Sequence, residues 1–328
     1  MLYVTTRNKY DTYTAFKANQ SDRGPDGGLF LPFRMPELTK EDIESLKQQS
    51  FSQRIATILN SFFGTQLTAW DVELYGGKNP VKMVPMGHRI LVAEMWRNHD
   101  QNYARFVGRL ASRICDDEDP ARKPTSWIGI AVRIAMLFGI FADLPAMQMP
   151  VDIVVATDDF SAPMAAWHAR EMGLPIGNII CSHDHPAVWN LLHQGEVRAD
   201  ENVPENMERL IAATLGVDEN LRFCEIREKG RIYATRTGML EPLRKGMYAT
   251  VCSQDRINAT IPSVYRMAGY VMGPQTALAY SGLQDYRART GETRFALLLA
   301  DKSPVADIKM VSECMEMSEY RLREIIGE

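Results

Sequence analysis

The chain has 328 residues, 45% of them hydrophobic, enough for about two domains or one large α/β domain. Its 37 Lys and Arg residues against 41 Asp and Glu residues give a formal net charge of −4, so neither nucleic acid nor an anionic membrane is an expected partner. The N-terminal MLYVTTRNKY has no apolar signal-peptide core, and the apolar stretch 128–141 contains Arg133 and is too short to cross a bilayer. The five cysteines are widely spaced without a CxxC, which indicates reduced thiols in a cytoplasmic protein.

The first third of the chain starts with turn-rich residues 1–36 and continues into helices. Thr39 is followed at the third helical position by Asp42, a pattern that predicts a capped helix start. The apolar spacing over 52–63 predicts a second helix. DVELYGG (71–77) is predicted as a strand with a glycine turn, and Pro85 is predicted to open a helix that carries the apolar residues of 90–96.

Residues 97–126 are the least regular part of the sequence and include the acidic run DDEDP (116–120). We expect a short surface connection here rather than an independent unit, because about 30 residues cannot bury a core without disulfides or metals.

The remaining sequence alternates between strands and helices. Buried strands are predicted at 151–157 and 176–182 with a helix at 162–173 between them, which implies parallel pairing. Further helices at 206–215, 274–290 and 318–326 and a strand at 295–300 complete the pattern. The predicted fold is α/β, with a mostly parallel sheet that contains these three strands and is flanked by helices.

Several segments, in the same order, are similar to the threonine synthase family. They are YVTTR (3–7), PDGGLFLP (25–32), PTSWIGIAVRIAMLFGIF (124–141), VDIVVATDDFSAPMAAWHAREMGLPIGNIICS (151–182), ENMERLI (205–211) and GPQTALAYSGLQDYRARTGETRFALLLADKSP (273–304). The resemblance implies the tryptophan-synthase-β-like fold, which carries pyridoxal phosphate (PLP). In such a protein a lysine forms the Schiff base, a glycine-rich turn at a helix N-terminus holds the phosphate, a polar group faces the pyridine nitrogen, and a small domain closes over the substrate.

Each of these requirements meets a departure in this sequence. The family's ELFHGPTxAFKD is matched by ELYGGKNPVKMV (73–84), which places Lys82 near the lysine position with a one-residue gap; Lys78 is the weaker substitute. The family's phosphate turn GNFG becomes Asp158, Asp159, Phe160 and Ser161, and its Thr-x-Ser-Pro begins here with Asp301. Two carboxylates at the turn would repel a phosphate dianion.

The small-domain motif ATSGDTG is absent, so the resemblance implies a threonine-synthase-like large domain with a reduced or missing small domain. The division that we expect is 1–96 for the N-terminal part of the large domain, 97–126 for the short connection, and 127–328 for the main α/β part.

Three groups of residues each allow a functional and a structural interpretation. Lys82 is either a Schiff-base lysine or a solvated lysine beside a turn. Asp158 and Asp159 are either an acid pair or cation site in an old cofactor pocket, or caps of the following helix, and we favour the caps. His183 and His185 would share one side of an extended segment, but no third metal ligand is evident, so we expect no metal site.

Two functions follow from the sequence. The first is a relative without PLP catalysis that binds a small-molecule ligand or a protein partner, with no cofactor. The second is a divergent PLP-dependent lyase of amino-acid metabolism that uses Lys82. An absorption spectrum separates them, since an internal aldimine absorbs visible light. The sequence leaves the ligand, the partner and a homodimer open.

Overall fold

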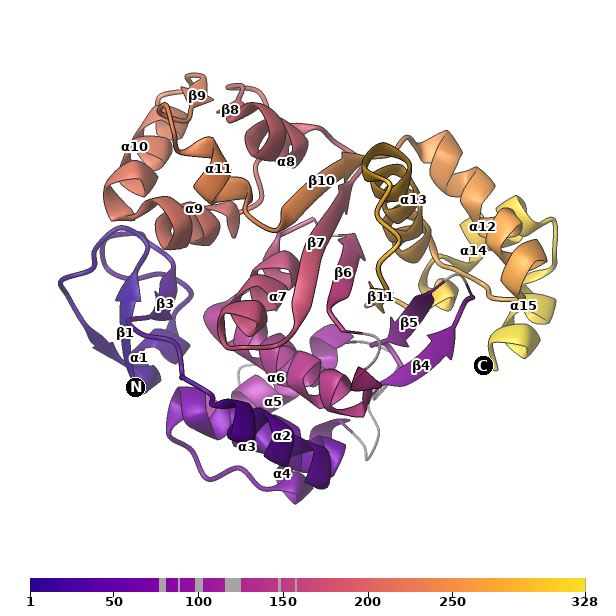
Figure 1. The fold of residues 1–328 in the computed structure, drawn as a ribbon, viewed down its shortest axis with the longest axis horizontal. Helices are drawn as coiled ribbons and strands as arrows, with labels where there is room; N and C mark the ends of the chain where they lie inside the picture. Colours follow the sequence, from indigo (N-terminus) through magenta and orange to yellow (C-terminus); the bar gives the residue numbers. More distant parts are fainter. Residues whose placement is uncertain are drawn as a thin grey trace.

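The computed structural model describes residues 1–76, 81–87, 89–97, 103–115, 125–146, 149–156 and 158–327. A six-stranded sheet runs through its centre in the order β10-β7-β6-β11-β5-β4 (Figure 1). All neighbouring strands pair in parallel except β4, which lies antiparallel to β5 at the edge. The strands predicted at 151–157, 176–182 and 295–300 are β6, β7 and β11 of this sheet, so the prediction of one mostly parallel sheet is confirmed.

The N-terminal part combines a small antiparallel sheet, order β2-β1-β3, with a group of helices. Its elements, up to the helix before β6, are β1 (Leu2–Thr5), β2 (Tyr13–Thr14), α1 (Ala15–Gln20), β3 (Phe30–Pro32), α2 (Lys40–Ser45), η1 (Leu46–Gln48), α3 (Phe51–Phe63), α4 (Ala69–Gly76), β4 (Lys82–Pro85), β5 (Ile90–Glu94), α5 (Tyr103–Cys115) and α6 (Trp127–Asp143). The Thr39 hydroxyl accepts the Asp42 N–H and the Asp42 side chain accepts the Thr39 N–H, which confirms the predicted cap of α2.

The rest of the chain supplies four further strands of the main sheet and a helical layer over it. Its elements are β6 (Val151–Ala156), α7 (Ser161–Glu171), β7 (Ile176–His183), α8 (Ala187–Trp189), η4 (Asn190–Gln194), β8 (Glu196–Val197), α9 (Met207–Leu215), α10 (Val217–Glu228), β9 (Tyr233–Ala234), α11 (Leu240–Arg244), β10 (Met247–Val251), α12 (Gln254–Ala268), α13 (Pro274–Thr290), β11 (Ala296–Ala300), η5 (Pro304–Asp307), α14 (Ile308–Met315) and α15 (Glu319–Ile326).

Successive side chains of the central strands point to opposite faces of the sheet and so contribute to two different apolar cores. Leu297 and Leu299 of β11 join the core that contains α3, α6 and α7, whereas Leu298 and Ala300 join the core that contains α12 to α15. Helices therefore cover both faces of the sheet. No helix in the described part of the chain is both long and apolar enough to cross a membrane.

Two predictions about 71–96 are wrong. Residues 71–76 belong to the helix α4, which packs on α3 and α5 instead of pairing in a sheet. The predicted helix after Pro85 is instead the strand β5, which lies between β11 and β4. Its short apolar run fits a strand buried on both faces as well as a helix, and periodicity alone does not distinguish the two.

The prediction that 97–126 is irregular is also incorrect in part. Residues 103–115 form α5, whose Phe106, Val107 and Leu110 are fully buried in the core that contains α3, α6 and α7. The apolar residues of this helix recur every three to four positions, and the charged residues between them obscured that period.

Candidate functional site

The candidate site residues Asp158 to Ser161 and Asp301 lie at the carboxyl edge of the sheet. They directly follow β6 and β11, which are neighbouring parallel strands. Ligands of open α/β sheets bind outside this edge. The order of these two strands therefore places these residues at one edge of the sheet.

The turn between β6 and α7 is closed by its own carboxylate. Asp159 Oδ1 accepts the backbone N–H of Ser161, the first residue of α7, at 2.7 Å. Phe160 is buried and takes a left-handed conformation with φ 63°, whereas the Asp158 side chain is exposed. Asp159 thus accepts an N–H bond at the helix start, as the capping interpretation predicted for this residue, although the N-cap position itself is Phe160, which makes no side-chain cap bond.

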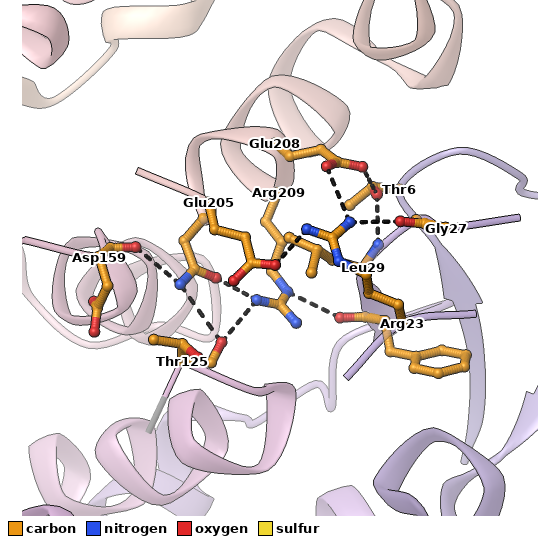
Figure 2. Close-up of polar contacts among 12 residues, drawn as sticks. Thr6, Arg23, Gly27, Leu29, Thr125, Asp159, Glu205, Glu208 and Arg209 are labelled. Atoms are coloured by element: carbon orange, nitrogen blue, oxygen red, sulfur yellow. Dashed lines mark hydrogen bonds and ion pairs between the residues drawn. The ribbon is translucent and has the colours of Figure 1, made fainter. Parts of the chain in front are cut away.

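Residues of α9 hold this turn from the other side (Figure 2). Asn206 Nδ2 donates to the Asp159 carbonyl at 3.0 Å and lies 3.5 Å from the Thr125 carbonyl. Arg209 is fully buried; it donates to Asn206 Oδ1, to the Thr125 carbonyl at 2.9 Å and to the Phe30 carbonyl at 3.0 Å. Burial lowers the pKa of Arg209 to about 10, with Glu205 opposing the shift, so the guanidinium stays charged at neutral pH.

The same helix is tied to the N-terminal part by charged contacts (Figure 2). The Thr6 hydroxyl donates to the buried Glu208 carboxylate at 2.5 Å and accepts the Leu29 N–H at 2.9 Å. Arg23 pairs with Glu205 and donates to the Gly27 carbonyl at 2.5 Å. These contacts connect 1–30, α9 and the turn into one polar network.

Asp301 is engaged by a buried arginine of α6. Arg133 Nη1 and Nη2 donate to the two carboxylate oxygens of Asp301 at 2.8 and 2.9 Å. The Arg133 side chain is 5% exposed and that of Asp301 is 17% exposed. This fork-shaped pair uses both oxygens of the carboxylate.

Lys82 does not join the turn. It starts β4, where it is exposed and pairs in register with Glu94, and β4 lies three strands away from β6. At the usual strand spacing this separation is roughly 14 Å. Lys78, the alternative lysine, lies outside the described residues.

His183, the last residue of β7, and His185 lie together, as their spacing suggested, with ring centroids 5.3 Å apart. Burial, reinforced by His185, lowers the pKa of His183 to about 3. Within the described residues no group of three or more His, Cys, Asp and Glu side chains has the arrangement of a metal site.

Sequence reasoning missed Arg133 and the pair Asn206 and Arg209 as residues that build this region. A signal for Arg133 existed, because a lone arginine in the apolar run 128–141 needs an acidic partner once it is buried. Asn206 and Arg209 are three positions apart, which places them on one side of the α9 turn. Their partners are backbone carbonyls, which the sequence does not reveal.

The fold and the turn at its carboxyl edge define an α/β protein with the architecture of threonine synthase, and three comparisons bear on this. Residues 2–74 match the family model of the threonine synthase N terminus. The proteins named Threonine synthase-like 1 of Homo sapiens and Pongo abelii are 26% identical over 146 residues, which cover 40% of this chain and 20% of theirs. The chain thus matches about a fifth of the length of these relatives.

Solved threonine synthases share the fold. The PLP-bound enzyme of Brucella melitensis superposes with a TM-score of 0.85 at 17% identity and covers 100% of this chain and 95% of its own. The yeast enzyme gives 0.82 at 14% identity, covering 96% and 90% of the two chains. The chain thus shares the fold of solved threonine synthases, and its N-terminal residues 2–74 resemble the N terminus of that family, so it is a threonine-synthase-like protein.

Proposed function

We propose that this threonine-synthase-like protein works without PLP catalysis and binds a ligand or a protein partner. The observation that carries the proposal is the bond from the Ser161 N–H to Asp159. Backbone N–H groups at a helix start are the usual donors to a phosphate. Here a carboxylate of the chain already occupies that place, so the anion position of the turn is filled from within.

Electrostatics acts in the same direction. A phosphate near Asp159 would meet a like charge, and such a contact at about 4 Å costs on the order of 4 kcal/mol at the effective dielectric of a protein surface. That cost corresponds to roughly a thousandfold loss of affinity. Because Asn206 holds the Asp159 carbonyl and Phe160 is buried, outward rotation of the turn would break existing contacts.

The environment of Asp301 also supports the proposal. By the family resemblance this residue would face the pyridine nitrogen of PLP, at the end of the ring away from the phosphate. Arg133 already pairs with both oxygens of this carboxylate and offsets its negative charge. A pyridine nitrogen facing Asp301 would therefore also meet the positive charge of Arg133, which would disfavour its protonated form.

The lysine is the third point. Lys82 starts the edge strand, and its segment begins in the helix α4. A second register with the family motif ELFHGPTxAFKD starts at Glu94, which ends β5 at the carboxyl edge of the sheet. In this register Met95 and Trp96 replace Leu and Phe, and the eleventh position, the family's lysine, is Ala104. Alanine cannot form a Schiff base.

The small domain is the fourth point. The helix α5 packs on α4 and α6, and its apolar residues belong to the core that contains α3, α6 and α7. The rest of the expected connection, residues 98–102 and 116–124, lies outside the described residues. Because about 30 residues cannot bury a core of their own, the proposal includes a reduced or missing small domain.

The alternative is a divergent PLP-dependent lyase that uses Lys82. A visible absorption spectrum of the purified chain, with and without added PLP, separates the two proposals. We expect no band beyond that of free PLP. An aldimine band that is lost in Lys82→Ala and kept in the exposed control Lys309→Ala would favour the lyase.

A further inference from the structure

We propose that a cavity between β4, β5 and the C-terminal helix α15 binds a small aliphatic carboxylate. This inference rests on the proposed function, because it gives the binding protein a ligand site that is separate from the turn at 158–161. The cavity measures about 220 Å³. Ligand sites for drug-sized molecules start at about 300 Å³, so the size restricts the occupant to a smaller compound.

Segments far apart in sequence enclose this cavity. Figure 1 shows α15 on the same side of the molecule as β4, and Ile325 and Ile326 of α15 line the cavity with Lys82 and Val84 of β4. Arg97 fastens this contact, because its Nη2 donates to the Ile326 carbonyl at 2.8 Å. The 269–271 loop and Pro304 complete the wall, so the cavity is built by the fold and is not a feature of one loop.

The polar groups that line the cavity select an anion. Glu94 is buried, and its carboxylate is engaged by Arg97 and by the Tyr270 hydroxyl at 3.0 Å. One donor stays available: Lys82 is exposed and has no hydrogen bond or ion pair among the described residues. Trp96 also lines the cavity, so its indole reports on what enters.

With Glu94 neutralised by Arg97, the Lys82 ammonium leaves the cavity with a net positive charge. A carboxylate provides the opposite charge, and its bonds to charged donors are the stronger kind.

The remaining wall is aliphatic. Val84, Val271, Ile325 and Ile326 line the cavity. A short branched hydrocarbon chain would bury apolar area against these side chains. A long chain exceeds the space, and the aliphatic walls match a branched hydrocarbon chain, so we assign the site to short aliphatic carboxylates.

The test uses 3-methylbutanoate as the probe and the indole N–H resonance of Trp96, assigned by its loss in Trp96→Phe, as the readout. We expect a saturable shift of this resonance in the full chain. The uncharged 3-methylbutanol should bind with a dissociation constant about tenfold higher or more, because it lacks the charge-assisted bonds. Lys82→Met should weaken carboxylate binding by about tenfold or more, and the matched exposed variant Lys309→Met should leave it unchanged.

An unshifted Trp96 resonance at saturating probe would overturn the inference, and so would equal binding of the acid and the alcohol or equal effects of the two lysine variants. Addition of PLP to the same samples tests the proposed function separately. A visible aldimine band with unchanged 3-methylbutanoate binding would remove the PLP-free proposal and leave the carboxylate site standing.

Discussion

The pair of Arg133 and Asp301 gives the account a quantitative test. Replacing Arg133 with Met removes two hydrogen bonds of 2.8 and 2.9 Å and leaves a carboxylate that is only 17% exposed. Breaking such a pair costs about 3–5 kcal/mol, and the residual exposure of Asp301 places the expected loss near the lower limit, about 3 kcal/mol. Asp301→Leu should cost at least as much, because it leaves a guanidinium that is 5% exposed without its charge partner.

The assay is urea-induced unfolding followed by fluorescence and circular dichroism, with coincident transitions as the check on two-state behaviour. The double variant Arg133→Met/Asp301→Leu should lose less than the sum of the single variants by about 2 kcal/mol. Arg321→Met, which breaks a surface pair with Glu324, is the control and should cost less than about 1 kcal/mol. Single losses that add to within about 0.5 kcal/mol would refute the coupling.

Three further outcomes are expected. Burial, followed by the charge of Arg209, lowers the pKa of His168 to about 3. The unfolded chain binds this proton near pH 6.5, so its contribution is complete above pH 6.5 and falls by about 2 kcal/mol between pH 6.5 and 5. His168→Phe should therefore lose about that much less stability than the parent between these pH values in urea unfolding; equal losses would contradict this. Asp158→Gly/Asp159→Asn should bind inorganic phosphate at least about tenfold more tightly than the parent in thermal-shift titrations, and Asp158→Asn alone should gain less; no gain in the double variant would remove the electrostatic argument. Asn206→Ala should cost about 2 kcal/mol in urea unfolding, because it leaves the Asp159 carbonyl without that donor, and a loss below about 0.5 kcal/mol would show that α9 does not hold the turn.

The sequence predicted the central sheet because its signals are local. The strands β6, β7 and β11 are short apolar runs bounded by turns, and the helix between the first two requires parallel pairing. The N–H bond that Asp159 accepts also follows from local chemistry at a helix start. The same local signals failed at β5, whose apolar run suits a helix and a buried strand equally.

The polar contacts of the candidate site could not be predicted from the sequence, for a different reason. Arg133 and Asp301 are 168 positions apart, and only the packing of α6 against the sheet edge brings them together. Lys82 was placed by motif similarity, whereas the position of β4 in the sheet decides its distance from the turn. Pairing order and side-chain direction at this range depend on the whole fold.

The most direct test of the central claim is covalent capture of PLP. The purified chain is titrated with PLP and reduced with borohydride, and the modified peptides are identified and counted by mass spectrometry. The account predicts only substoichiometric labelling spread over exposed lysines, because Asp159 fills the anion position of the turn and Lys82 lies three strands away. Stoichiometric labelling at Lys82 that disappears in Lys82→Ala would contradict it.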